Sequence, residues 1–259
     1  MSDAGTADSE RAGLEQTLQT ALEAGVRVQM SGGYTARVYD TMDRIARAMG
    51  ADRVEGSVTA AIVGLTVHRG GWSRTAFHRT PHIGVDFSEL SALSQLTRDA
   101  PGLSPDGIRE RLDAIEHTER RYPVGLVLPM LGVACAAFAV LFGSDAAGAA
   151  IAGLGGFAGA LTRHLMVRRQ FVPFIFCLAG ALVSTTVVLL MSPVTGTSTQ
   201  ALAACVLWLV PGVPMLNGVA DLLATHYLNG IVRLAMSAVI VFASGLGVSI
   251  ALGLWGWLR

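Results

Sequence analysis

The sequence contains no lysine, and its second half is nearly free of acidic residues. All 19 basic residues are arginine, and 17 of the 19 acidic residues lie in residues 1–121, which leaves only Asp145 and Asp221 beyond them. The zero net charge indicates neither nucleic acid nor an acidic partner. Charged residues make up 15% of the chain, against about 25% in soluble domains, and hydrophobic residues make up 52%. This composition favours a membrane protein.

Motifs of nucleotide and metal chemistry are absent as well. The sequence has no Walker loop, no GxSxG, no HExxH and no CxxC. Any transport must therefore draw on an ion gradient, a solute gradient or a partner protein. Cys135, Cys177 and Cys205 each lie in a different apolar segment without a neighbour at ligand spacing, so we interpret them as buried packing residues. We expect no metal, no cofactor and no catalytic residue.

Residues 1–121 carry the pattern of a small soluble domain. The first ten residues lack the basic start and the apolar run of a signal peptide, so we expect this part to stay in the cytoplasm. A strand is expected over 53–69, interrupted near Gly64, and a second strand over 72–80. The expected helices are 10–25, 31–50, 86–100 and a fourth from Ser104 onward. The expected domain is α+β, with the element order ααββαα.

Five apolar segments follow from residue 122 onward. A helix needs about 20 apolar residues to cross a hydrocarbon core about 30 Å thick. The expected spans are 124–142, 146–162, 171–191, 200–219 and 231–257. The fold class is therefore a membrane protein, an α-helical five-span transmembrane bundle (122–259) preceded by a small α+β cytoplasmic domain. Five spans cannot form two equal inverted halves, so we expect a homo-oligomer or a second chain that completes the unit.

Basic residues alternate between the links that join these spans. Arg120 and Arg121 precede the first span, a basic link at 163–170 follows the second, and Arg233 follows the fourth. The two intervening links carry no basic residue. By the positive-inside rule, the N-terminus faces the cytoplasm and the C-terminus lies outside. We expect a multi-pass protein of a bacterial inner membrane. Membrane lipid is thus an expected partner, and nucleic acid is not.

Three histidines in the soluble part raise the question of a site. His68 and His78 could face each other on a hairpin, with His82, Asp86 and Glu89 nearby, which would suit a metal ion or acid–base chemistry. Their spacing matches no known motif. Solvated or half-buried histidines explain the pattern equally, and both interpretations stay open at this point.

The fourth span is interrupted by its own sequence, LVPGVPMLNGVADLL. Pro211 and Pro214 lack amide hydrogens and, with Gly212, break the helix, so carbonyl groups about one turn earlier lose their helical partners. At membrane depth a broken helix survives only beside protein or a watery cavity, where its polar groups can bind an ion or a small solute. Asn217 and Asp221 follow one turn apart on the same helical face. An ionisable residue in a span indicates a functional site.

Milder interpretations of these residues also stay open. The prolines can produce a plain kink, and Asp221 can lie at the cytoplasmic interface near His226 or Arg233. Arg163 and His164 close the second span. They can bind an anion or relay protons at the inner mouth, or Arg163 can simply anchor the helix end at the interface.

Two stretches resemble the threonine/serine exporter family. They are SGGYTARVYDTMDRIARAMGAD, followed by a Val/Thr-rich strand, and WLVPGVPMLNGVADLLATHYLNGIVRL. The most specific parts are the PGVP-x₂-N-x₃-D run that ends at Asp221 and Gly230 before the last span, and the resemblance covers about residues 14–250. It implies a cytoplasmic domain followed by five spans. Fused members continue into a second five-span unit, so this chain resembles the large subunit of the split form, whose partner is a separate small five-span membrane subunit.

The resemblance implies a proton-coupled secondary exporter of small polar metabolites, either threonine and serine or dicarboxylates such as succinate. We expect a solute with a carboxylate to bind at the broken fourth span, with Asp221 as proton acceptor or polar gate. The predicted substrate- and ion-binding residues are Pro211, Gly212, Pro214, Asn217, Asp221, Arg163 and His164. Two other functions stay open: a regulatory or assembly subunit, and a membrane-anchored enzyme with catalysis in residues 1–121. Five spans exceed what an anchor needs, so we expect no enzyme.

Overall fold

The computed structural model describes residues 2–80, 84–117 and 122–258 of the chain. Its contacts divide the chain into two compact units. The first, here called the domain unit, is Met1–Arg120 together with Val213–Leu234. The second, the membrane unit, is Arg121–Gly212 together with Ala235–Arg259. The domain unit therefore includes a segment from the end of the fourth expected span and the beginning of the fifth, in addition to the N-terminal residues.

The domain unit begins with two helices, a three-stranded sheet and two further helices. These elements are α1 (Ser2–Met30), α2 (Thr35–Ala48), β1 (Arg53–Val58), β2 (Ile62–Arg69), β3 (Trp72–Arg79), α3 (Phe87–Asp99), the 3-10 turn η1 (Ala100–Gly102) and α4 (Pro105–His117). The expectation of one strand over 53–69 with an interruption near Gly64 is wrong. The chain turns at residues 59–61, because the Thr59 amide donates to the carbonyl of Ile62 at 2.8 Å and the Thr59 hydroxyl accepts from the Ile62 amide at 3.1 Å.

The sheet is antiparallel in the order β1-β2-β3. Gly70 and Gly71 form the β2–β3 turn with φ of +55° and +82°, which the tight hairpin requires and glycine permits. This turn pairs His68 with Ser73 and His78 with Val63. The expectation that His68 and His78 face each other is therefore wrong, because the two-residue turn places them towards opposite ends of the hairpin.

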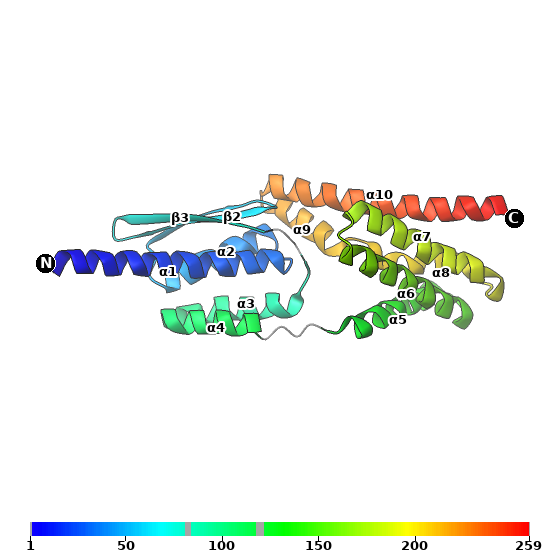
Figure 1. Ribbon diagram of the computed structural model, residues 1–259, viewed down its shortest axis with the longest axis horizontal. Helices are drawn as coiled ribbons and strands as arrows, with labels where there is room; N and C mark the ends of the chain where they lie inside the picture. Colours follow the sequence, from blue (N-terminus) through cyan, green and yellow to red (C-terminus); the bar gives the residue numbers. More distant parts are fainter. Residues whose placement is uncertain (1, 81–83, 118–121, 259) are drawn as a thin grey trace. The chain divides into compact units, whose positions relative to one another are not determined.

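One face of the sheet packs against α1 and α2 (Figure 1). Val63, Leu65 and Val67 alternate along β2 and are buried, as the two-residue period of a strand with one covered face predicts. The helices contribute apolar residues at helical spacing to the same core, including Leu14, Leu18 and Leu22 of α1, Val38, Met42 and Ile45 of α2, Leu90, Leu93 and Leu96 of α3, and Ile108 and Leu112 of α4. This core holds the N-terminal end of α2 in place.

The membrane unit is built from helices that are apolar along their whole length. Its elements are α5 (Val124–Leu141), α6 (Ala146–Arg168), α7 (Pro173–Met191), the 3-10 turn η2 (Ser192–Val194), α8 (Ser198–Cys205), the 3-10 turn η3 (Leu207–Leu209) and the larger part of α10 (Tyr227–Leu258). Among the described residues, four helices are long and apolar enough to cross a membrane, or five if the bent pair Ser198–Leu209 and Gly212–Leu223 counts as one span. A helical membrane protein is thereby confirmed.

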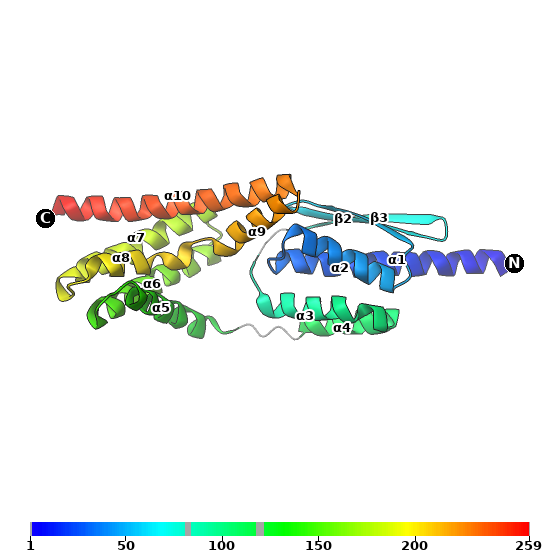
Figure 2. The same cartoon turned by 180° about the vertical axis from the view of Figure 1, so that it is seen from behind.

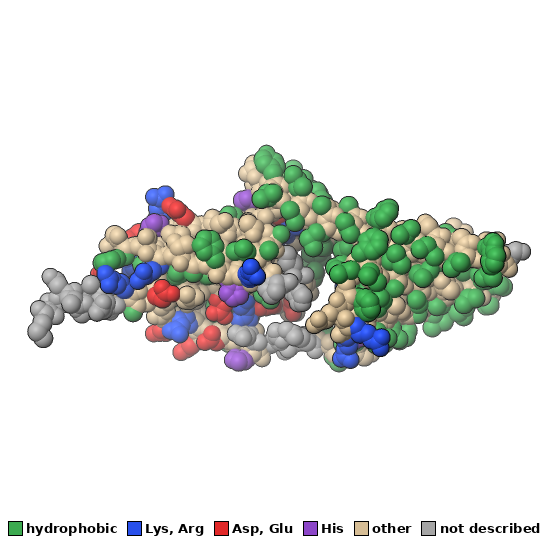
Figure 3. Space-filling model, turned by 45° about the horizontal axis from the view of Figure 1, so that its top comes forward, with side chains coloured by type: hydrophobic (Ala, Val, Ile, Leu, Met, Phe, Trp, Pro, Cys, Tyr) green, Lys and Arg blue, Asp and Glu red, His purple; other side chains and the backbone are tan. Residues whose placement is uncertain are grey.

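The surface of the membrane unit agrees with this assignment. Hydrophobic side chains cover most of its visible face, whereas the charged side chains lie mainly on the domain unit, apart from one basic cluster at an edge of the membrane unit (Figure 3). Met130, Leu141 and Phe242 are among the large apolar side chains that it exposes. Apolar surface of this extent indicates contact with lipid or with another membrane protein.

Glycines bring α6 close to its two neighbours (Figures 1 and 2). A Cβ on Gly153 would lie 3.1 Å from the carbonyl oxygen of Gly132 on α5, and a Cβ on Gly159 would lie 2.6 Å from that of Gly180 on α7. Only residues without a side chain let helix backbones approach this closely in a membrane. The Gly- and Ala-rich sequence of α6 thus serves tight packing against two helices.

Asp145 joins two loops at one end of the membrane unit. Its Oδ1 accepts from the Gly148 amide at 2.6 Å and from the Thr195 hydroxyl at 2.8 Å, and its Oδ2 accepts from the Gly196 amide at 3.3 Å. These donors, the Gly148 amide foremost, hold the pKa of Asp145 below its ordinary value, because they favour the charged carboxylate. Asp145 thus caps α6 and ties it to the loop before α8.

Asp145→Asn is expected to make the melting temperature less sensitive to acid. The pKa is depressed in the folded state, so the stabilisation by the carboxylate is complete above its ordinary value of about 3.9 and is lost as the pH falls through the lower folded value. Melting curves of the wild-type chain and the variant in detergent, compared from about pH 6 to about pH 2, should converge at the acid end. A difference that stays constant over this range would contradict the assignment.

Candidate functional site

The predicted break in the fourth span is confirmed. α8 ends at Cys205, η3 covers Leu207–Leu209, and α9 (Gly212–Leu223) begins after a gap, with an angle of 61° between the two segments. Pro214 stands in the first turn of α9, where a missing amide hydrogen removes no helical bond. Pro211 lies in the gap itself. The two prolines therefore separate two helices and do not bend one.

Backbone groups at the break find partners at short range. The carbonyls of Leu207 and Val210, which lie one turn before Pro211 and Pro214, accept from the amides of Val210 and Gly212 at 3.2 and 2.5 Å. The Leu209 amide donates to the Val206 carbonyl at 3.1 Å. Each carbonyl oxygen has a second lone pair, so a solute or ion at the break would bind in addition to these turns.

Asp221 on α9 is completely buried in the domain unit, where it caps the N-terminus of α2. Its Oδ1 accepts from the Thr35 amide at 2.8 Å, and its Oδ2 accepts from the Thr35 hydroxyl at 3.0 Å. The residue that precedes α2, Tyr34, provides no side-chain cap. The Asp221 carboxylate takes this place, and its negative charge is favoured there by the dipole of α2.

Arg233 on α10 compensates the charge of Asp221. Its Nε lies 3.3 Å from the Asp221 Oδ2, its Nη2 donates to the Gly33 carbonyl at 3.0 Å, and the residue is only 7% exposed. One turn earlier on α10, the Asn229 amide donates to the Thr35 hydroxyl at 3.0 Å and to the Val58 carbonyl at 2.8 Å. A buried ion pair needs such additional hydrogen bonds to offset the loss of hydration. We call Thr35, Asp221, Asn229 and Arg233 the buried polar cluster.

Asn217 points to the same stretch of the domain unit. Its Nδ2 donates to the Gly32 carbonyl at 2.7 Å, so Asn217 and Asp221 both reach residues 32–35, as their spacing of one turn predicts. The backbone amide of His226 donates to the Asp221 carbonyl at 2.8 Å, and its ring stacks on Tyr39 with the centroids 5.5 Å apart. The predicted residues after the break are thus engaged by α2 and the loop before it.

Arg163 and His164 belong to the membrane unit and lie within α6, which continues to Arg168. The helix continues six residues beyond the apolar run 146–162, and the place of these two residues at the end of the second span stays a prediction. Arg163 is exposed, and its guanidinium lies over the Phe176 ring of α7, 5.4 Å from the centroid. This is a cation–π contact, which directs the charge towards the seam between α6 and α7.

The proposed histidine site finds no support in the domain unit. Asp86 caps α3 by accepting from the amides of Ser88 and Glu89 at 2.9 and 3.0 Å, and Glu89 binds Arg27 Nε at 2.9 Å. His82 lies outside the described residues. Among the residues that the structure describes, no three of His, Cys, Asp and Glu gather as a metal ion requires. Both carboxylates therefore have structural partners.

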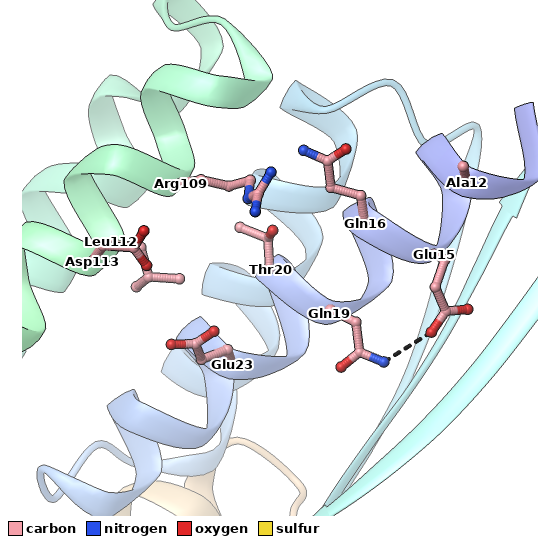
Figure 4. Close-up of a pocket in the computed structure, with 9 residues that line it drawn as sticks. All are labelled: Ala12, Glu15, Gln16, Gln19, Thr20, Glu23, Arg109, Leu112 and Asp113. Atoms are coloured by element: carbon pink, nitrogen blue, oxygen red, sulfur yellow. Dashed lines mark hydrogen bonds between the residues drawn. The ribbon is translucent and has the colours of Figure 1, made fainter. Parts of the chain in front are cut away.

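A polar groove of about 530 Å³ lies between α1 and α4 of the domain unit. Arg109 reaches from α4 towards Gln16 and Thr20 of α1, and Gln19 donates to Glu15 at 2.9 Å (Figure 4). The groove is lined by Ala12, Glu15, Gln16, Gln19, Thr20, Glu23, Arg109, Leu112 and Asp113. Three acidic side chains stand here against one basic side chain, so this groove does not suit a dicarboxylate.

Sequence reasoning named His226 and Arg233 as neighbours of Asp221, which the structure confirms, but it missed Thr35 and Asn229. Asn229 and Arg233 repeat on α10 the one-turn spacing of Asn217 and Asp221 on α9, and this repetition in two apolar segments joined by a short turn was a usable signal. Nothing in the sequence singled out Thr35. Its role depends on the packing of residues far apart in the chain.

Comparisons with known proteins agree with these features. A family model described as "Putative threonine/serine exporter" matches residues 19–255. The "Probable succinate transporter subunit YjjP" of Escherichia coli (strain K12) is 32% identical over 241 residues, which cover 91% of this chain and 93% of that protein. The protein of the same name from Klebsiella aerogenes is 29% identical over 241 residues, with coverages of 91% and 92%. No solved structure matches the chain.

The family match covers the domain unit from residue 19 onward, the broken span and nearly all of the last span. Membership of an exporter family implies a multi-pass membrane transport protein and not an enzyme. The resemblance drawn from the PGVP-x₂-N-x₃-D run is thereby confirmed, and the chain belongs to the threonine/serine exporter family.

Proposed function

We propose that this chain is one subunit of a proton-coupled secondary exporter of small polar metabolites in a bacterial inner membrane. The solutes are threonine- and serine-type amino acids or dicarboxylates such as succinate. The N-terminal domain lies in the cytoplasm, and a separate small five-span subunit, or a second copy of the chain, completes the transporter. The family match and the names of two relatives as subunits of a succinate transporter support this proposal.

The observation that carries the proposal is a helix break that leads directly to a buried ion pair. The chain leaves η3, passes Pro211 and Gly212, and reaches Asp221 within one helix. Interrupted helices and ionisable residues in apolar segments are costly, and they are kept where solutes or ions bind. We place the polar end of the solute at the backbone of Pro211, Gly212 and Pro214.

Asp221 is the proposed proton acceptor or polar gate. Beyond residue 121 the only other acidic residue is Asp145, which is occupied as a helix cap. Protonation of Asp221 would remove its attraction for Arg233 and leave a buried positive charge that an anion can compensate. Proton binding and the contact between α9, α10 and residues 32–35 are thereby linked.

The remaining predicted residues have supporting roles in the proposal. Asn217 contributes its amide to the solute after releasing the Gly32 carbonyl, which it now binds at 2.7 Å. Arg163, with His164 beside it, attracts carboxylates towards the α6–α7 seam, because an exposed guanidinium is the preferred partner of a carboxylate.

Efflux measurements test the proposal. Cells that express this chain with a candidate small five-span subunit of the same family are expected to export preloaded succinate, threonine or serine faster than cells with either chain alone. Asp221→Asn is expected to reduce the proton-dependent rate to that of the empty vector, because an amide neither takes up a proton nor pairs with Arg233. Asp40→Asn on the exposed face of α2 is the matched control and should keep the wild-type rate.

Two results would count against the proposal. If the paired chains export none of these solutes, the export function is wrong for this chain. If export is normal in Asp221→Asn at equal protein levels, Asp221 is not the proton acceptor. Orientation is tested separately by labelling single cysteines introduced into residues 1–121 from either side of the membrane.

A regulatory or assembly subunit is the second candidate function, and one observation favours it. The side chains of Asn217, Asp221, Asn229 and Arg233 all bind residues 32–35 or 58 of the domain unit. Such contacts suit a subunit with a structural role, in a complex whose other subunit performs the transport. In that case the partner is essential for export, while Asp221→Asn affects only the stability of this chain.

A further inference from the structure

Three buried polar atoms of the membrane unit have no hydrogen-bond partner among the described residues. They are Ser184 Oγ and Thr185 Oγ1 on α7 and the indole Nε1 of Trp208 on η3. Ser184 and Thr185 are completely buried. Buried polar atoms are nearly always paired, so each exception requires an explanation.

Other hydroxyl groups in these helices are paired. Thr162 donates to the Ala158 carbonyl at 2.9 Å, Thr186 to the Leu182 carbonyl at 2.8 Å and Ser244 to the Ile240 carbonyl at 2.9 Å. Each uses the carbonyl one turn earlier, which is the usual solution for a hydroxyl in an apolar helix. Ser184 and Thr185 depart from this rule although the same helix offers them the same carbonyls.

Ser184 and Trp208 lie together where α6, α7 and η3 meet. The Ser184 hydroxyl occupies the place that a Cβ on Gly159 would take. The Trp208 ring stands one turn away along α7, with its Cη2 3.3 Å from the position of a Cβ on Gly180. Glycine at 159 and at 180 makes room for the Ser184 hydroxyl and the Trp208 ring. Trp208 is carried by the 3-10 turn at the helix break, where the α-helical ladder is interrupted.

The chemistry of this place suits an anionic oxygen. An indole N–H only donates, and a hydroxyl without a partner can donate as well. The charged residues of α6 and α7 are Arg163 and Arg168, both basic. Arg163 stands one turn beyond Gly159, with its guanidinium over Phe176, one turn before Gly180. The seam between α6 and α7 thus has a positive charge near one end and unpaired donors deeper inside.

We propose that Ser184 and Trp208 form an intramembrane binding site for a carboxylate group of the exported solute, which Arg163 attracts along the α6–α7 seam. This inference rests on the proposed export function and names a second contact place for its solute. Burying a polar atom without a hydrogen-bond partner is costly, so apolar helices are not expected to contain such atoms unless a ligand pairs with them. A carboxylate supplies the acceptors that the described residues do not.

Ser184→Ala separates a binding role from a structural one, because the two predict opposite signs. Removal of a buried hydroxyl without a partner is expected to raise the melting temperature of the chain. The same change removes a donor to the carboxylate and should weaken binding about ten-fold or more. Trp208→Phe should weaken binding in the same way. Thr186→Val, which removes a paired and exposed hydroxyl of α7, is the matched control and should leave binding unchanged.

Binding is measured on the full-length purified chain in detergent, from the rise of its melting temperature with succinate, threonine or serine. The proposal expects a rise for the wild type and for Thr186→Val, and a much smaller one for Ser184→Ala and Trp208→Phe. It is overturned if Ser184→Ala responds like the wild type, or if none of the three solutes stabilises the wild type.

Efflux with the five-span partner distinguishes this inference from the export function itself. If the wild type exports the solute and Ser184→Ala does so with an unchanged KM, the site is wrong and the function stands. If the stabilisation depends on Ser184 but the paired chains export nothing, the site stands and the function is wrong.

Discussion

Asp221→Leu is expected to lower the free energy of unfolding by about 3 to 5 kcal/mol, the cost of removing one partner from a buried ion pair. The variant leaves Arg233, which is 7% exposed, with a buried charge that Asp221 no longer compensates. It also removes the acceptor of the Thr35 amide and hydroxyl at the beginning of α2. For a chain of this size the loss corresponds to a fall of roughly 6 to 20 °C in melting temperature.

The double variant Asp221→Leu/Arg233→Met tests the cause of this loss. Replacing both charges with apolar side chains removes the uncompensated charge, so the double variant should be more stable than Asp221→Leu alone. Asp40→Asn is the control: it breaks an Arg–Asp pair of similar length, 2.8 Å, on the exposed face of α2. Its melting temperature should stay close to that of the wild type, because water screens exposed pairs. Additive losses in the double variant would show that the two residues do not act as a pair.

Much of the helical architecture is predictable from the sequence because it depends on local properties. Long apolar runs give α5, α7 and α10, and two prolines without amide hydrogens give the break before α9. The spacing of Asn217 and Asp221 correctly predicts that they point the same way. Local patterns fail where a polar residue acts on the backbone, as at Thr59, which closes the turn that divides the expected strand.

The buried polar cluster is not predictable in this way. Asp221 is 186 positions from Thr35, and the pair is brought together by the packing of α2 against α9 and α10 within one unit. Neither residue carries a pattern that names the other. The same limit holds for Ser184, because the sequence cannot tell a hydroxyl that bonds its own helix from one that faces Gly159 on α6.

Gly230→Leu is expected to destabilise the domain unit by about 3 kcal/mol, the upper end for overpacking. Gly230 lies on α10 next to Gly218 and Leu222 of α9. A Cβ there would stand 2.8 Å from the carbonyl oxygen of Gly218 and 2.7 Å from Leu222 Cγ. Leu222 can change its rotamer, but the Gly218 carbonyl is backbone and moves only with α9. Since Asn229 and Arg233 flank Gly230 on α10, the displacement would also separate Arg233 from Asp221.

Gly245→Leu on the same helix is the matched control, because no described atom beyond its chain neighbours and its own helical backbone lies within 4 Å of a Cβ at that position. Both variants add the same side chain to α10, so any difference between their melting temperatures reports the contact with α9. Combining Gly230→Leu with Asp221→Leu adds a second test. If the glycine acts by keeping Arg233 next to Asp221, the combined loss is smaller than the sum of the two single losses. Equal melting temperatures for Gly230→Leu and Gly245→Leu would mean that α9 and α10 do not need this close approach.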